Sequence, residues 1–374
     1  MDGAGAYLDY NATAPLRPSV RDAMVQAFAA PGNPSSVHGY GRAARRLMEE
    51  SREAVAALVG APAEAVIFTS GGTEANALAM TGWRCARRVV SAIEHPSILK
   101  YGDGPTVAVT ADGRIDAAAL GSLLSRLDGP ALVAAMLVNN ETGVIQPIDD
   151  IVAVAKAHGA LVHCDAVQAA GRMPVDIVRL GVDSLALSAH KLGGPTGVGA
   201  LVLARTDVDL EPLIRGGGQE RSYRGGTENL AGIAGFAAAA RAVAADAAAE
   251  TGRVAALRDR LEAEVRSLAP DAVLFGALAP RVANTSCLAL PGVAAQTLLM
   301  GLDLAGVAVS SGSACSSGKV APSHVLTAMG AGRLAAGAIR ISLGWASDDA
   351  DVDRFLSAFA ALVRRLRPAE VAGV

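Results

Sequence analysis

Short apolar runs alternate with amphipathic segments through the first half of the chain, from Ala65 to Lys191. The apolar runs have the length of buried strands, and between them apolar residues recur at the spacing of a helix. We expect strands at residues 65–70, 88–93, 131–138, 160–165 and 183–187, and helices at residues 17–30, 39–59, 74–80 and 151–158. This alternation predicts a mainly parallel sheet with functional groups at its carboxyl edge.

The second half of the chain has a different pattern. An Ala-rich stretch at 230–268 predicts a long helix, broken near Thr251 and Gly252, that leads into a second domain. After it we expect strands at residues 273–275, 284–290, 307–309 and 338–344, and helices at 294–304 and 349–366. A chain of 374 residues is long enough for two domains. The pattern as a whole predicts an α/β protein.

Composition narrows the class of protein. Hydrophobic residues make up 51% of the chain and aromatic residues only 3%, so Ala, Val, Leu and Ile must build the core. A formal charge of −3 provides no electrostatic surface for nucleic acid or an anionic membrane. The first residues lack the pattern of a signal peptide, and no apolar run is expected to span a membrane. We therefore expect a soluble, cytoplasmic protein whose cysteines, Cys85, Cys164, Cys287 and Cys315, are reduced.

Lys191 lies just after the apolar run 183–187, in the stretch Ser188-Ala189-His190-Lys191. Lysine is among the residues least often buried, so its place at the end of a buried strand needs an explanation. A Schiff base to an aldehyde cofactor would provide one, because desolvation lowers the pKa of an amine and frees its lone pair. A surface lysine at a strand end explains the stretch equally well.

A glycine turn, Gly71-Gly72-Thr73, joins the strand at 65–70 to the helix at 74–80. Free backbone N–H groups and the helix dipole would make this turn an anion site, to which Thr73 could add a hydroxyl. The alternative is an ordinary turn with Thr73 as the N-cap. Neither the dinucleotide nor the nucleotide-triphosphate glycine motif is present.

Further polar residues follow the other expected strands. They are His95, Asn140, Asp165, Gln168 and His190. Each has a structural alternative, such as a turn asparagine or a satisfied core histidine, but their shared position at strand ends favours one site. We expect no metal site, because the adjacent residues His163, Cys164 and Asp165 would point to opposite faces of a strand.

Three features of the remaining chain also carry possible chemistry. Cys315 stands in a run of small residues, 310–318, which suits an exposed nucleophile. Arg340 lies in an otherwise apolar strand and needs a carboxylate, from either a substrate or the protein itself. The glycine-rich loop 215–229, with Thr227, could hold a phosphate or a partner subunit, or be a solvated linker.

A lysine amine, a carboxylate, an imidazole and an anion site together match the requirements of pyridoxal 5′-phosphate (PLP). The chain moreover resembles the group I cysteine desulfurases (NifS/IscS type) of the class V aminotransferase, PLP fold-type I enzymes. The motifs that carry the resemblance are TSGGTEAN (69–76), EHP (94–96), NNETG (139–143), HCDAVQ (163–168), SAHK (188–191), RGGTEN (224–229) and SSGSACSSG (310–318). One departure is Ala189, where many relatives have glycine.

The resemblance implies a large PLP-binding domain with a mainly parallel sheet, residues 13–246. It implies a smaller α+β domain, residues 1–12 and 247–374, that carries Cys315 and Arg340. The enzyme would be a homodimer that converts L-cysteine to L-alanine. It would pass the sulfur to an acceptor protein, either an iron–sulfur scaffold or a tRNA-thiolation enzyme.

The resemblance also implies a role for each site residue. Lys191 would hold PLP, Asp165 would pair with the pyridine nitrogen, Gln168 would bind the phenolic oxygen, and His95 would stack on the ring. The phosphate would be bound by Gly72, Thr73, Ser188 and His190, and by Thr227 of the other subunit. Asn140 and Arg340 would hold the substrate carboxylate, Cys315 would take the sulfur, and His95 would accept the proton of the substrate thiol.

Two other classes of function remain open at this point. Another enzyme of the same fold, such as a small-substrate aminotransferase or a selenocysteine lyase, would show keto-acid-dependent turnover or release mainly selenide. A non-catalytic binding module would bind no chromophore.

Overall fold

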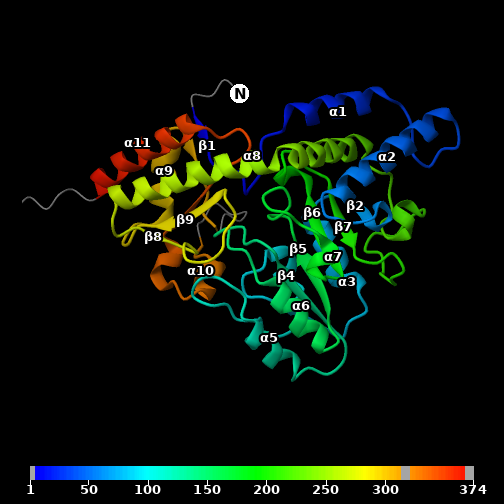
Figure 1. The fold of residues 1–374 in the computed structure, drawn as a ribbon, viewed down its shortest axis with the longest axis horizontal. Helices are drawn as coiled ribbons and strands as arrows, with labels where there is room; N and C mark the ends of the chain where they lie inside the picture. Colours follow the sequence, from blue (N-terminus) through cyan, green and yellow to red (C-terminus); the bar gives the residue numbers. More distant parts are fainter. Residues whose placement is uncertain (1–4, 313–320, 367–374) are drawn as a thin grey trace, which may run out of the picture.

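The computed structural model describes residues 5–312 and 321–366. Its centre is a six-stranded sheet in the order β2-β7-β6-β5-β4-β3 (Figure 1). The strands are β2 (Val66–Thr69), β3 (Arg87–Val90), β4 (Ala131–Met136), β5 (Leu161–Asp165), β6 (Ser184–Ser188) and β7 (Gly199–Leu203). β3, β4, β5 and β6 are parallel, and β7 runs antiparallel to both of its neighbours. The structure confirms the α/β class with a mainly parallel sheet.

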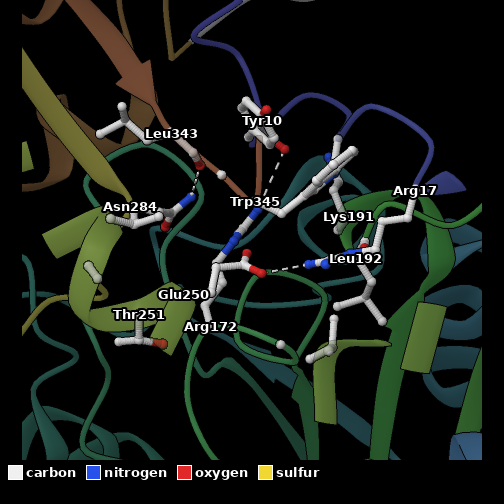
Figure 2. Close-up of a pocket in the computed structure, with 16 residues that line it drawn as sticks. Tyr10, Arg17, Arg172, Lys191, Leu192, Glu250, Thr251, Asn284, Leu343 and Trp345 are labelled. Atoms are coloured by element: carbon white, nitrogen blue, oxygen red, sulfur yellow. Dashed lines mark hydrogen bonds and ion pairs between the residues drawn. The ribbon is translucent and has the colours of Figure 1, made fainter. Parts of the chain in front are cut away.

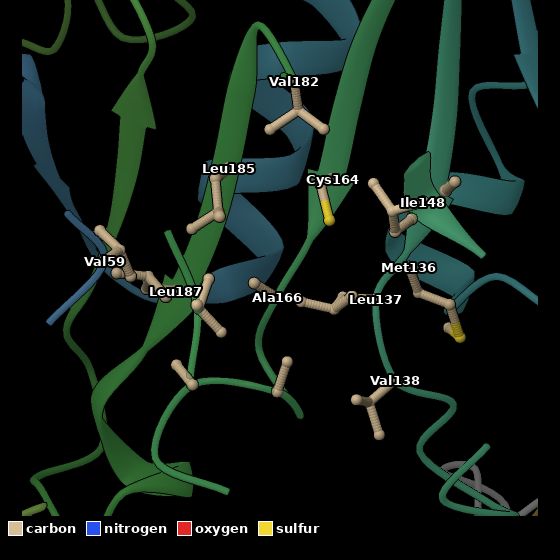
Figure 3. Packing of buried hydrophobic residues seen from close by; sticks show 14 of the residues in the cluster. Val59, Met136, Leu137, Val138, Ile148, Cys164, Ala166, Val182, Leu185 and Leu187 are labelled. Atoms are coloured by element: carbon tan, nitrogen blue, oxygen red, sulfur yellow. The ribbon is translucent and has the colours of Figure 1, made fainter. Parts of the chain in front are cut away.

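Both faces of this sheet are buried, which explains its continuous apolar runs. Cys164, Leu185 and Leu187 point into the core on one face (Figure 3), and Ala186 and Leu201 point into the core on the other. The helices around the sheet are α1 (Pro18–Ala29), α2 (Gly39–Ala57), α3 (Gly72–Gly82), α4 (Pro96–Leu99), α5 (Ala117–Leu124), α6 (Ile148–Ala157) and α7 (Ile177–Leu180). α3 packs against β5, β6 and β7, so its first turn lies at the carboxyl edge.

The C-terminal part of the chain has its own sheet and core. β8 (Val273–Leu274), β9 (Thr285–Ala289) and β11 (Ala338–Ser342) form a three-stranded antiparallel sheet, and β1 (Ala6–Tyr7) pairs with β10 (Val307–Ala308). The helices of this part are α9 (Ala295–Leu304), α10 (His324–Ala328) and α11 (Asp349–Leu366). Leu8 packs in the same apolar cluster as Phe355 and Phe359, so the N-terminal residues join the C-terminal core.

Helix α8 (Leu230–Leu268) is continuous over 39 residues, so the expected break near Thr251 and Gly252 is wrong. A glycine inside a helix costs only about 1 kcal/mol, and α8 recovers more than this by packing along α1 and α2 (Figure 1). Phe236 of α8 lies in the core of the large sheet and Leu261 in the C-terminal core. The domain boundaries at 12/13 and 246/247 stay a prediction.

Helix α8 bears on the expectation that no apolar run spans a membrane without a charge or a turn, because its apolar stretch is interrupted by Arg241 and Asp246. Among the described helices, α8 alone is long and apolar enough by length and composition, with a mean hydropathy of 1.4 in its most apolar window. Of that window, 56% is buried inside the protein. Burial against α1 and α2 accounts for its apolar composition.

Candidate active site

A cavity of 250 Å³ opens where the carboxyl ends of β4, β5 and β6 meet the first turn of α3. The register of the strands places Met136, Asp165 and Ala186 side by side, which brings these strand ends level. The residues that line the cavity are Gly72, Thr73, Asn76, His95, Ser97, Met136, Val138, Asn140, Asp165, Val167, Gln168, Ser188, His190 and Lys191. Most of the residues proposed from the strand-end pattern therefore surround one space.

Lys191 projects into this cavity from the 3₁₀ turn that follows β6. Its Nζ donates hydrogen bonds of 2.5 and 2.8 Å to the carbonyl oxygens of Asn11 and Ala12. Burial, together with the positive charges of Arg172 and Arg340, lowers the pKa of Lys191 to about 7. A large fraction of the amine is then neutral near pH 7, which is the form that adds to an aldehyde.

A second, smaller cavity, shown in Figure 2, reaches Lys191 as well. The side chain of Arg172 extends through it, with Nη2 3.5 Å from the carbonyl oxygen of Tyr10. Glu250 also lines this cavity but is paired with Arg17 at 2.7 Å. No described carboxylate lies within ion-pair distance of Arg172, so its positive charge acts on Lys191 without a counter-ion.

Asp165 lies at the end of β5 and is only 6% exposed. Its two oxygens accept hydrogen bonds of 2.8 Å from Nδ2 of Asn76 and 3.0 Å from the backbone N–H of Val167. Nδ2 of Asn76 also donates to Ser97, and its Oδ1 lies 2.9 Å from Nε2 of His163. Asp165 is thus a fixed carboxylate on the floor of the cavity.

His95 lines the cavity from the start of α4. The backbone N–H of Ser97 donates to Nδ1 at 3.2 Å, and the hydroxyl of Ser97 lies 2.8 Å from the same nitrogen. Burial lowers the pKa of His95, so the ring is neutral at pH 7. Because Nδ1 accepts, the neutral ring carries its proton on Nε2, which is a donor in this state.

The first turn of α3 meets the requirements of an anion site. Gly71 is its N-cap and no side chain caps it, so the alternative with Thr73 as the N-cap is not what the structure has. Its first N–H groups are open to a ligand. A Cβ on Gly72 would lie 2.7 Å from Cγ2 of Val167, so glycine permits this close approach of α3 to the residues that follow β5.

The other predicted phosphate ligands of this chain lie on the same cavity. Ser188 ends β6 and is buried, and His190 follows it. Nδ1 of His190 lies 3.1 Å from the hydroxyl of Thr13, and burial with the charge of Lys191 lowers the pKa of His190 to about 4. The ring is therefore neutral at pH 7, so any contact with an anion would be a hydrogen bond and not an ion pair.

These groups fit PLP. A low-pKa amine, a fixed carboxylate and an uncapped helix N-terminus are the three groups that its aldehyde, pyridine nitrogen and phosphate require. Gln168 lies beside them, with its Nε2 donating 3.0 Å to the carbonyl oxygen of Asn11 and its Oε1 accepting from Arg172. One Nε2 hydrogen of Gln168 remains for a ligand.

Arg340 is buried on β11 beside the cavity rather than among its lining residues. Its Nη2 forms an ion pair of 2.7 Å with Asp9, and its Nη1 donates 3.0 Å to the carbonyl oxygen of Asn140. The internal ion pair, left open from sequence, is thus present. Nε of Arg340 is buried without a hydrogen-bond partner in the described structure, so the guanidinium retains a free donor.

One predicted residue, Thr227, lies away from the cavity in the described structure. It is exposed on the loop before α8. Arg224 of the same loop is held by Glu74 of α3 at 2.9 Å, which brings the loop toward the anion site. Cys315 lies outside the described residues.

Sequence reasoning missed Asn76, Ser97, Asn11 and Asp9. Asn76 and Ser97 each stand a few residues beyond a predicted ligand, and both hold a predicted residue in place. Asn11 and Asp9 come from the N-terminal segment, whose only signal was a set of small polar residues between apolar ones. Their partners lie more than 150 positions away.

Comparisons with known proteins agree with this geometry. The model of the family Aminotransferase class-V matches residues 6–355. The chain is 44% identical to a protein named cysteine desulfurase from Cereibacter sphaeroides, over 96% of each chain. It is 42% identical to an IscS-like cysteine desulfurase from Mycobacterium tuberculosis, over 98% of each chain. It superposes on a solved NifS-like protein from Rickettsia africae with a TM-score of 0.89 and 35% identity, covering 96% of this chain and 99% of that one.

Proposed function

Because the chain belongs to the class-V aminotransferase family and, within it, to the cysteine desulfurases, we propose that it removes sulfur from L-cysteine at the cavity around Lys191. Like its family, it depends on PLP. The observation that carries the proposal is the low-pKa amine of Lys191 in one cavity with Asp165 and the uncapped first turn of α3.

PLP, when bound, supplies an electron sink for the bonds at Cα of the amino acid. Asp165, fixed by Asn76, would hold the pyridine nitrogen, and Lys191 Nζ would take the proton from Cα of the amino acid. Asn140 and Arg340 hold the substrate carboxylate, for which Arg340 has an unpartnered Nε–H in the described structure. Neutral His95 donates from Nε2 in this state, so taking the thiol proton at Nε2 requires the other neutral tautomer, in which the ring proton is on Nδ1 and faces the hydroxyl of Ser97.

Transfer of the substrate sulfur to Cys315 needs no added oxidant or reductant. The Cys315 thiolate attacks the sulfur of the substrate, a sulfur–sulfur bond forms, and the carbon–sulfur bond breaks. The electron pair of that bond stays on Cβ, which takes up a proton, so the products are L-alanine and a persulfide on Cys315. A second thiol must then remove the outer sulfur. We propose a sulfur-acceptor protein of iron–sulfur assembly or tRNA thiolation as its owner, in the cytoplasm.

We also propose that two copies of the chain form a homodimer. Thr227 is exposed on a single chain, and the same loop region exposes the apolar side chains of Leu213 and Ile214, 46% and 40% accessible. A second copy of the chain would cover these side chains and bring Thr227 to the phosphate site of its partner.

Incubation of the holoenzyme with L-cysteine tests the function. We expect equimolar L-alanine and protein-bound persulfide in a single turnover, and neither product from Cys315→Ala. Keto-acid-dependent turnover without persulfide would instead identify an aminotransferase. Release of selenide far above that of sulfide would identify a selenocysteine lyase.

A further inference from the structure

Glu141 is a buried carboxylate that the proposed reaction does not use. It follows Asn140 directly, is 1% exposed and does not line the cavity. No described cation lies within ion-pair distance of it. A carboxylate buried without a cation is costly, so its neighbours must account for its position.

One neighbour is Gly312, three positions before Cys315. The Cα of Gly312 approaches the Glu141 carboxylate so closely that a Cβ built on it would lie 1.8 Å from Oε2 and 2.3 Å from Cδ. A side chain at position 312 would displace the Glu141 carboxylate from this position. The contact therefore places Gly312, just before the segment that carries Cys315, directly against Glu141.

The other neighbour is Ser323, at the far end of the same segment. Its hydroxyl donates a hydrogen bond of 2.5 Å to Oε2 of Glu141. The same hydroxyl accepts from the backbone N–H of Leu326 at 3.0 Å and so caps α10. One carboxylate oxygen thus touches both the residue that precedes the segment 313–320 and the helix that follows it.

Glu141 is itself held rigidly beside the substrate site. Oδ1 of Asn139 accepts from the backbone N–H groups of Glu141 and Thr142, each at 3.0 Å. Ser310, just before Gly312, exchanges two backbone hydrogen bonds with Arg340. The chain therefore enters the segment 313–320 next to Asn140 and Arg340, the residues proposed to bind the substrate carboxylate.

We propose that Glu141 is a positioning residue for the sulfur-accepting cysteine. It joins the two ends of the segment 313–320 and fixes them relative to Asn140, so that Cys315 can reach the sulfur of a bound cysteine. This inference rests on the proposed function, in which Cys315 takes the sulfur. Glu141 touches neither substrate nor cofactor, and it acts through Gly312 and Ser323.

The test separates ligand binding from sulfur transfer in the holoenzyme. Glu141→Ala removes both contacts, and we expect the single-turnover rate of persulfide formation to fall by about ten- to a hundredfold, the cost of a misplaced reacting group. The dissociation constant for L-alanine, which needs no sulfur transfer, should change less than about threefold, or about 0.6 kcal/mol. Glu141→Gln keeps the shape and an acceptor for Ser323, and should restore most of the rate.

Two further variants separate an effect on sulfur transfer from an effect on folding. Gly312→Ala leaves the carboxylate in place but collides with it, so the same selective loss of sulfur transfer is expected. Ser286→Ala is the matched control, because Ser286 is a buried serine of β9 whose hydroxyl has no partner in the described structure. It should retain the wild-type rate.

Unchanged persulfide formation in both Glu141→Ala and Gly312→Ala would overturn the inference. Equal loss of L-alanine binding and sulfur transfer in both would also overturn it, because that result indicates a general structural role. Cys315→Ala distinguishes a failure of the proposed function from a failure of the positioning role of Glu141. If it still transfers sulfur, the proposed function fails, whereas an inactive Cys315→Ala with an active Glu141→Ala rejects the positioning role alone.

Discussion

Asn76 donates a hydrogen bond of 2.8 Å to Asp165, and its carbonyl oxygen lies 2.9 Å from Nε2 of His163. The carbonyl oxygen can only accept, so His163 must carry its proton on Nε2. Burial lowers the pKa of His163 to about 3, which keeps this ring neutral. Because the carboxylate of Asp165 can only accept, a turned Asn76 amide would set oxygen against oxygen, so the amide donor faces Asp165.

Replacing Asn76 tests the importance of this orientation. Asn76→Leu keeps the volume of the side chain but leaves Asp165 without one donor and His163 without its acceptor. A hydrogen bond to a charged group contributes about 1.5–3 kcal/mol, so kcat/KM for L-cysteine should fall by about ten- to a hundredfold. Thr81→Ala, at the other end of α3, is the control, since Thr81 donates only to a carbonyl of its own helix. Equal activity of the two variants would show that Asp165 needs no such support.

The strand-end residues of the site could be predicted because their positions follow from local pattern. Buried strands of a parallel sheet end at one edge, so Asp165 and Lys191 could be assigned to one place without knowing their contacts. Asn76 could not be recognised, because its role depends on a histidine 87 positions away. The break expected at Gly252 failed for the same reason: packing against α1 and α2, not local propensity, decides that α8 is continuous.

Lys191 provides a pH-dependent prediction. Its pKa is lowered to about 7 from the ordinary 10.5, so the neutral amine forms as the pH rises through about 7. The initial rate of PLP uptake by the apoprotein should rise over the same range and level off above it. Arg172→Met removes one of the repelling charges and should move the midpoint to higher pH. The measurement is the growth of the visible absorbance band after mixing, from pH 6 to 9.5. A rate that still rises steeply above pH 9 would contradict the lowered pKa.

Glu220 and Arg52 provide a prediction about stability. They form a buried ion pair with hydrogen bonds of 2.7 and 2.8 Å, and Glu220 also accepts from the backbone N–H of Phe68. Glu220, Arg221 and Ser222 have positive φ angles of 44°, 54° and 69° in succession, a strained arrangement that these contacts must hold. Glu220→Gln leaves the buried guanidinium with only Glu49, a partly exposed carboxylate 3.1 Å from its Nε, and should lower the free energy of unfolding by about 3 kcal/mol, the lower end for a broken buried pair.

Urea denaturation of the purified protein measures this difference. Asp207→Asn is the matched control, because Asp207 also pairs with an arginine, Arg205, but both side chains are exposed. Water and salt screen such a pair, so its loss should leave the denaturation midpoint unchanged. If both variants shift the midpoint equally, burial of the Glu220 pair is not what stabilises the loop.

The ion pair between Asp9 and Arg340 predicts an effect on substrate affinity. In the described structure Asp9 accepts from Nη2 of Arg340, so a substrate carboxylate at Nε would meet a guanidinium whose charge is already paired. Asp9→Asn removes the competing charge and should lower KM for L-cysteine by about tenfold, or roughly 1.5 kcal/mol, with little change in kcat. Arg340→Lys replaces the planar guanidinium, which can bind a carboxylate with two donors, by a single ammonium group, and it should raise KM instead. Steady-state kinetics of both variants show whether Asp9 weakens substrate binding or orients Arg340 for the substrate. If Asp9→Asn also raises KM, Asp9 orients Arg340 for the substrate and does not compete with it.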